Sequence, residues 1–247
     1  MSYRLGVDVG GTFTDLLLVN DKNGRTWSAK VPSTPADQSI GVLNGISRIC
    51  EHAGIEPSGI EHVMHGTTVA TNTVLTGTGA KCGLVTTKGY RQVLQIARSY
   101  VPGGLGGWVI YNKSLPMAGL ASTIEADERV SARGEVVHKL DESKLRKDLQ
   151  ALKKQNIEAL TVCLINSFAN DKHEKRIKAI AMEEMPDIPV SLSSEVVPEM
   201  QEYERTVTTV ANSYVRPRVA RYVKNLKAKI EQQSGKIKLH ILRSDGG

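Results

Sequence analysis

Two consecutive glycines, Gly10 and Gly11, separate two apolar segments close to the start of the chain. Both segments are rich in Val and Leu, which is typical of strands, and the glycines allow a tight turn between them. A second turn ends in Gly24, where a positive φ is usual, and an alternating segment follows. The chain therefore has to open as an antiparallel β-meander. We expect its strands at residues 4–9, 15–20 and 25–31.

The remaining chain alternates between short apolar runs and amphipathic segments, which predicts an α/β fold. The first helix is expected to begin with Thr34 as N-cap and Pro35 at its first position, and to stop at Gly54. The run at 159–165 is almost continuously apolar, which indicates a strand buried on both faces. Further strands are expected at 62–64, 83–87, 123–130, 136–140, 188–192 and 237–242, and helices at 70–75, 90–97, 141–155, 171–185 and 202–233, the last interrupted at Pro217.

Composition limits the classes of function. With 40% hydrophobic residues in 247 the chain can bury a sizeable core, while 4% aromatics argue against base stacking. The net charge of +6 is concentrated in residues 216–238, which we interpret as a solvated helix face or subunit contact and not as a nucleic-acid site. Three distant cysteines, the lack of a signal peptide and the lack of a long apolar run predict buried thiols in a cytoplasmic protein without a membrane segment.

The segment from Gly6 to Asp15 carries the clearest chemistry. Its strand delivers Asp8 to its end, where the carboxylate can hold Mg²⁺ through water. The amides of Gly10 and Gly11 can form an anion nest, and a side chain at Gly11 would intrude on a phosphate and on a backbone of positive φ. Hydroxyl donors are expected from Thr12 and Thr14.

Two familiar nucleotide motifs are excluded at this segment. No Gly-Lys-Ser or Gly-Lys-Thr follows the glycines, so the loop is not a Walker A loop. A strand and not a helix follows them, so it is not a Rossmann fingerprint. The alternative is an ordinary Gly-Gly hairpin with an incidental Asp8, which we consider the less favoured interpretation because an acid, two glycines and two threonines coincide.

Two other segments contain candidate site residues. His65, Gly66, Thr67 and Thr68 lie at a strand-to-helix junction, where a threonine can cap the helix and free amides can bind an anion. His62 and His65 would point to opposite faces of a strand, which excludes a metal pair. Glu128 and Arg129, like Glu204 and Arg205, are equally suited to contact an anionic substrate or to form structural ion pairs.

The first fifteen residues resemble the first phosphate loop of the actin-like ATPase superfamily, which has a ribonuclease H-like fold. In that superfamily a second phosphate loop opens the second lobe, and Asp245, Gly246 and Gly247 fit its place after a long helix. Many sugar kinases carry Lys or Arg shortly after the first glycines, whereas this chain has Asp15. That difference argues against a simple sugar kinase.

A closer resemblance, to the hydantoinase A and 5-oxoprolinase family, covers essentially the whole chain. This family also includes acetone and acetophenone carboxylase subunits, and its members are much longer. The resemblance implies an N-terminal domain at 1–185 and the start of a second domain at 186–247. The segments that carry it are GVDVGGTFTD (6–15), HGTTVATN (65–72), DERV (127–130), NSFAN (166–170), HE (173–174), SEVVPE (194–199), EYERT (202–206), NSYV (212–215) and RSDGG (243–247).

The resemblance implies a set of site residues. Asp8 and Asp245 would be catalytic, with Mg²⁺ held by Asp8 through water. The remaining members would bind the nucleotide phosphates or face the substrate. The phosphate-binding set is Gly10, Gly11, Thr12, Thr14, Asp15, Gly246 and Gly247, and the substrate-side set is His65, Gly66, Thr67, Thr68, Asn72, Glu128 and Arg129.

The expected function is the N-terminal ATPase portion of an ATP-dependent cyclic-amide hydrolase that phosphorylates the amide oxygen. ATP, Mg²⁺, a cyclic-amide substrate, the C-terminal part of the chain and a hydantoinase B-type subunit are the implied cofactors and partners. Alternatives are an ATP-dependent ketone carboxylase subunit, an actin-fold small-molecule kinase and a non-enzymatic nucleotide-binding activator. We expect the 247-residue chain by itself to fold, to bind ATP weakly at best and to hydrolyse neither ATP nor a cyclic amide.

Overall fold

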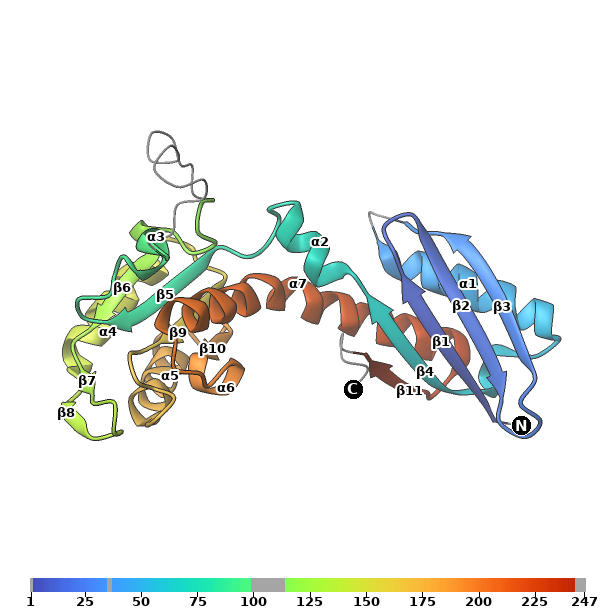
Figure 1. Cartoon of the computed structure of the whole chain (residues 1–247). Helices are drawn as coiled ribbons and strands as arrows, with labels where there is room; N and C mark the ends of the chain where they lie inside the picture. The colour runs from blue at the N-terminus through green and yellow to red at the C-terminus, as the bar shows by residue number, and fades with distance from the viewer. Residues whose placement is uncertain (1, 35–36, 99–113, 243–247) are drawn as a thin grey trace, which may run out of the picture. The chain divides into compact units, whose positions relative to one another are not determined.

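The computed structural model describes residues 2–34, 37–98 and 114–242, which form two compact units (Figure 1). The first unit contains Met1–Thr76 with Arg218–Gly247, and the second contains Gly77–Pro217. This spatial division is separate from the sequence division at residues 185 and 186, which stays a prediction.

The first unit is built on a mixed five-stranded sheet in the order β11-β4-β1-β2-β3. The first three strands pair antiparallel, as the meander predicts, and Gly24 has the expected positive φ of 69°. The two later strands add in parallel beside β1. The strands are β1 (Tyr3–Val9), β2 (Phe13–Asn20), β3 (Thr26–Pro32), β4 (Ile60–Thr67) and β11 (Lys238–Ile241).

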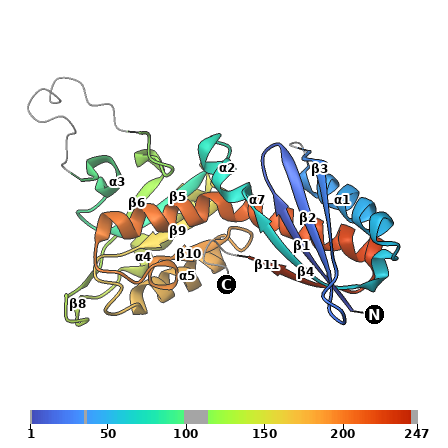
Figure 2. The same ribbon diagram turned by 45° about the vertical axis from the view of Figure 1, so that its right-hand side comes forward.

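One face of this sheet carries the core of the unit. Alternate residues of β1 and β2 point to it, among them Leu5 and Leu18, which are completely buried. They pack against Ile46 from α1 (Gln38–Ala53) and against Leu226 and Ile230 from α7 (Glu202–Ser234). Figures 1 and 2 show α1 along this face of the sheet. The unit also contains η1 (Pro57–Gly59) and α2 (Val69–Leu75).

The second unit is a parallel four-stranded sheet in the order β10-β9-β5-β6. β9 is buried along its whole length, as its apolar run predicts. Leu160 and Val162 face one core with α4 and α5, while Ala159 and Cys163 face another core with Val210 of α7. The elements are β5 (Cys82–Thr87), α3 (Val93–Ile96), η3 (Leu120–Ser122), β6 (Thr123–Ala126), β7 (Arg129–Val130), β8 (Val136–His138), α4 (Glu142–Lys153), β9 (Ala159–Cys163), α5 (Lys172–Glu184), β10 (Val190–Leu192) and α6 (Ser193–Val196).

Three expectations about elements were wrong. The first helix begins at Gln38 with Asp37 as its N-cap and not with Thr34, because the Asp37 carboxylate accepts the Ser39 amide; Pro35 lies outside the described residues. The strand expected at 123–130 is divided into β6 and β7, and β7 pairs with β8 in a separate two-stranded sheet. The helix expected at 90–97 is reduced to α3, which ends at Ile96 and is followed by Ala97 with a positive φ of 52°.

The long helix is also not interrupted at Pro217, which lies inside α7. A proline within a helix removes one backbone hydrogen bond and costs about 3 kcal/mol. Val210 before it and Leu226 after it are buried in the two different cores. Burial of both ends of α7 therefore offsets the local cost of the proline.

Gly45 generates a prediction about how α1 packs on the sheet. A Cβ at this position would lie 2.3 Å from Cδ1 and 3.1 Å from Cγ of the buried Leu16. We expect Gly45→Ala to lower the free energy of unfolding by about 1–3 kcal/mol through overpacking, although alanine normally favours a helix interior. Urea unfolding measures this, with Asn44→Ala on the exposed side of α1 as control. A stabilised Gly45→Ala protein would contradict the packing.

Candidate phosphate site

The turn between β1 and β2 is held in shape by hydrogen bonds from the chain after β3. The Gly10 amide donates to the Phe13 carbonyl at 3.0 Å and closes the turn. The Ser33 amide donates to the Thr12 carbonyl at 2.9 Å, and the Ser33 hydroxyl donates to the Gly10 carbonyl at 2.9 Å. The turn is thus held by hydrogen bonds within the protein itself.

The outer part of this turn offers backbone donors. Gly11 and Thr12 are exposed, and neither amide has an acceptor within the described part of the chain. A Cβ at Gly11 would meet no atom within 4 Å, and Gly11 is not among the glycines of positive φ. The expectation of a positive φ at Gly11 was therefore wrong, and no protein atom crowds a side chain at this position.

The hairpin register sorts the candidate side chains onto two faces. Asp8 lies directly opposite Asp15, and Asp15 lies directly opposite Lys30 on β3. All three face away from the core and line a hollow of about 720 Å³. Thr14 points to the other face, where it is completely buried and its hydroxyl lies 3.0 Å from the Ser33 hydroxyl. Thr14 therefore supports the turn from behind.

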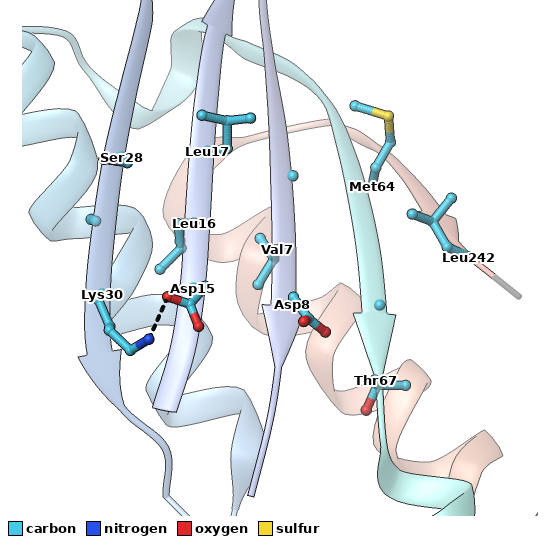
Figure 3. Close-up of a pocket in the computed structure, with 13 residues that line it drawn as sticks. Val7, Asp8, Asp15, Leu16, Leu17, Ser28, Lys30, Met64, Thr67 and Leu242 are labelled. Carbon is cyan, nitrogen blue, oxygen red and sulfur yellow. Dashed lines mark ion pairs between the residues drawn. The ribbon is translucent and has the colours of Figure 1, made fainter. Parts of the chain in front are cut away.

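Figure 3 shows how the charged residues of the hollow lie. The Asp15 carboxylate points to the Lys30 ammonium, 3.0 Å away, and Asp8 projects from the next strand. Thr67 and Met64 on β4 line the other side. Two carboxylates directly opposite each other repel, so a cation between or beside them is favoured.

Gly66 makes room for the Asp8 carboxylate. The two residues are register partners on β1 and β4, and a Cβ at Gly66 would lie 3.3 Å from Asp8 Oδ1. Asp8 is exposed, and its oxygens are hard donors of the kind that Mg²⁺ prefers. The residues present therefore fit a hydrated Mg²⁺ held by Asp8 beside the turn.

His65 lies behind this site and not in it. Its side chain is fully buried, and its Nε2 lies 2.9 Å from the hydroxyl of Tyr222 on α7. Burial lowers the pKa of His65 to about 4, against the opposing charge of Asp8, and burial raises the pKa of Tyr222 to about 12. Both groups are neutral near pH 7, and they join β4 to α7.

The remaining residues of this junction connect it to the turn. The Thr68 hydroxyl donates to the carbonyl of Val9 at 3.2 Å and accepts from the Asn72 side chain at 3.2 Å. Thr68 is the N-cap of α2, but its side chain does not cap the helix. The Thr67 hydroxyl instead accepts the Val69 amide at 3.3 Å. Thr68 therefore holds the end of β1, and the first amide of α2 donates to the hydroxyl of Thr67.

Glu128 and Arg129 belong to the second unit and are not among the described residues that line the hollow. The Glu128 carboxylate is buried, accepts from the Thr87 hydroxyl and lies 2.7 Å from Nδ1 of His173. The Arg129 guanidinium lies 5.3 Å from the centre of the Tyr90 ring. Both residues thus contact other residues of the same unit. Asp245, Gly246 and Gly247 lie outside the described residues.

Sequence reasoning missed Ser33, Lys30 and Tyr222. The position of Lys30 could have been predicted from the sequence. The turn between β2 and β3 pairs Asn20 with Arg25, and five residues further from the turn on each strand Asp15 lies opposite Lys30. Ser33 and Tyr222 had no such signal, because their partners are distant in the sequence.

Within the described residues there is no group of three or more His, Cys, Asp or Glu side chains suited to hold a metal. In the same part of the chain, no helix combines the length and the apolar character that a membrane span needs.

Comparisons with known proteins match both ends of the chain to one family. Residues 4–185 match the model of the hydantoinase/oxoprolinase N-terminal region, and residues 205–247 match the model of hydantoinase/oxoprolinase. The crystal structure of the ATP-dependent caprolactamase from Pseudomonas jessenii superposes with a TM-score of 0.87 at 30% identity, covering 99% of this chain and 36% of that one. The fold is thereby that of the actin-like ATPases, with sheets flanked by helices.

Three relatives show the range of the family. Caprolactamase subunit alpha of Pseudomonas jessenii is 32% identical over 99% of this chain. The acetophenone carboxylase gamma subunit of Aromatoleum aromaticum is 35% identical over 85%, and 5-oxoprolinase 1 of Arabidopsis thaliana is 29% identical over 99%. The chain spans 36%, 31% and 21% of the lengths of these relatives.

The buried His65 predicts a specific loss of stability in acid. Its pKa in the folded protein is about 4, below the ordinary 6.5, so the unfolded chain takes up a proton first as the pH falls. Between pH 7 and pH 4 this linkage should remove about 3 kcal/mol of unfolding free energy. Urea unfolding of wild type and His65→Gln at both pH values tests it. We expect a smaller loss in the variant, and equal losses would contradict the buried neutral imidazole.

Proposed function

The chain belongs to the hydantoinase/oxoprolinase family, and we propose that it forms the phosphate-binding N-terminal part of an ATP-dependent cyclic-amide hydrolase. The observation that carries the proposal is the preorganised turn at Gly10–Thr12 with the Asp8 carboxylate beside it. Caprolactamase and 5-oxoprolinase among the relatives support a cyclic amide as substrate. The three cysteines are free and buried, which supports a cytoplasmic location.

An amide carbonyl is a poor electrophile. Transfer of the terminal phosphoryl group of bound ATP to its oxygen would release ADP and make the carbon open to attack by water. The residues described here would contribute positioning and charge. The Gly11 and Thr12 amides would bind phosphate oxygens, and Asp8 would hold hydrated Mg²⁺ against them. Ser33 would keep the turn fixed, so the donors need little reorganisation when phosphate arrives.

We propose that the rest of the site comes from elsewhere in a longer assembly. Asp245, Gly246 and Gly247 are proposed as a second phosphate loop at the start of a domain that begins near residue 186, with Asp245 catalytic. The relatives named as alpha and gamma subunits support a partner subunit, for which a hydantoinase B-type protein is our proposal. Glu128 and Arg129 remain proposed substrate-side residues from the second unit.

A ketone carboxylase is the second candidate, because the acetophenone carboxylase gamma subunit is 35% identical to the chain. The complete subunit with its partner separates the two functions. ADP release that depends on caprolactam, hydantoin or 5-oxoproline supports the hydrolase. ADP release that depends on a ketone and bicarbonate, with no response to cyclic amides, would replace it by the carboxylase.

Asp8 generates a prediction about magnesium-dependent binding. We expect Asp8→Asn to weaken binding of Mg·ATP to this chain at least about tenfold, because the amide cannot replace an anionic oxygen beside hydrated Mg²⁺. Isothermal titration calorimetry measures the affinity, and circular dichroism checks the fold. Asp187→Asn, an exposed acid of the second unit, is the charge-matched control. Equal affinities of Asp8→Asn and wild type would remove Asp8 from the site.

Gly11 separates a ligand effect from a folding effect. Because a Cβ at Gly11 meets no protein atom within 4 Å, Gly11→Val should leave the unfolding free energy within about 0.5 kcal/mol of wild type. The same side chain would occupy space beside the exposed amides and should weaken Mg·ATP binding. Calorimetry and urea unfolding of one protein sample test both parts. Unchanged affinity in a folded Gly11→Val protein would show that phosphate does not approach this turn.

A further inference from the structure

The side chains that line the hollow beside the turn carry more negative than positive charge, which disfavours binding of a triphosphate unless a cation contacts it. Asp8 and Asp15 contribute two carboxylates that lie opposite each other. Lys30 is the basic member of the described lining residues. An ionised carboxylate is an acceptor and carries the same sign as phosphate, so Asp15 cannot bind phosphate oxygens directly. The phosphate-binding role expected for Asp15 therefore needs a cation next to it.

We propose that Lys30 is the cation that contacts the nucleotide phosphates and that Asp15 is its positioning residue. This inference rests on the proposed function and deepens it. The register places Lys30 on β3 directly opposite Asp15, and the ammonium lies 3.0 Å from the Asp15 carboxylate. Asp15 therefore holds the ammonium of Lys30 on the open face of the sheet, in the same row as Asp8.

The surroundings of Lys30 leave its ammonium able to bind a further anion. Its side chain is 58% exposed, and that of Asp15 is 56% exposed, so solvent and a further anion can reach the ammonium. An ammonium has three N–H donors, and one of them is directed to Asp15. The ring of Phe13, the first residue of β2, lies 5.2 Å from Nζ. This contact places the ammonium next to the residue that closes the turn.

The arrangement accounts for the acid that follows the glycines in this sequence. A cation for the phosphates is supplied here from the neighbouring strand, and Asp15 fixes its direction across the hairpin. A lone lysine on an exposed strand would sample many rotamers, and ordering it at the moment of binding costs affinity. The Asp15 carboxylate lowers this cost by holding the side chain on the correct face.

The test compares phosphate ligands with a ligand that lacks phosphate. Calorimetry is carried out on the 247-residue chain with Mg·ATP, magnesium tripolyphosphate and adenosine. We expect Lys30→Met to weaken both phosphate ligands at least about tenfold with no change for adenosine, and Lys30→Arg to stay within about threefold of wild type. Lys22→Met is the control with the same loss of charge, in the turn between β2 and β3, and should change affinity less than about twofold.

A double-mutant cycle tests the positioning role of Asp15. If Asp15 directs Lys30, the loss caused by Lys30→Met should be at least about threefold smaller in an Asp15→Asn background than in wild type. Equal losses in both backgrounds would overturn the role of Asp15, since a purely long-range charge effect is additive.

The outcomes also separate this inference from the proposed function. If wild type binds Mg·ATP in a manner that depends on Asp8 while Lys30→Met binds as tightly, Lys30 is not the phosphate cation and the proposed function stands. Equal weakening by Lys30→Met and Lys22→Met also overturns the inference, because net charge alone would then explain it. If neither the 247-residue chain nor the complete subunit with its partner binds either phosphate ligand, both the inference and the proposed function fail.

Discussion

The hydrogen-bond register of the first hairpin decides what this site can do. Side chains alternate across a strand, so a shift by one residue would exchange the two faces of β2. The observed register puts Asp8, Asp15 and Lys30 in one row on the open face and sends Thr14 into the core. The short turn then brings the Gly11 and Thr12 amides to the end of the same row. Other contacts within the first unit support this arrangement.

That support comes from three elements of the first unit. Ser33 holds the turn through its amide and its hydroxyl, and Thr68 donates to the carbonyl of Val9 where β1 ends. Behind the sheet, the buried pair of His65 and Tyr222 joins β4 to α7. Because these contacts are made within the protein itself, a phosphate would meet donors that are already oriented.

The sequence was sufficient for the meander, the α/β alternation, the doubly buried β9 and the glycine turn with Asp8, since these depend on local periodicity and turn chemistry. It was not sufficient where the structure depends on contacts between residues that are distant in the sequence. Continuous helix through Pro217 depends on burial in two cores, and the place of His65 depends on Tyr222. Family-like segments in the second unit illustrate the same point: the buried Glu174 accepts the Leu164 amide at 2.9 Å, and the buried Arg205 donates to the Leu164 carbonyl at 2.7 Å. Both buried charges therefore bond to the backbone of Leu164, and residue spacing in the sequence does not reveal these contacts.

The central claim is that phosphate binds at the turn between β1 and β2. A crystal structure of the chain with Mg²⁺ and a non-hydrolysable ATP analogue tests it most directly. We expect phosphate oxygens within hydrogen-bond distance of the Gly11 and Thr12 amides, with Mg²⁺ linked to Asp8 through water. Phosphates bound in another place, with the turn and Asp8 facing only solvent, would contradict the account.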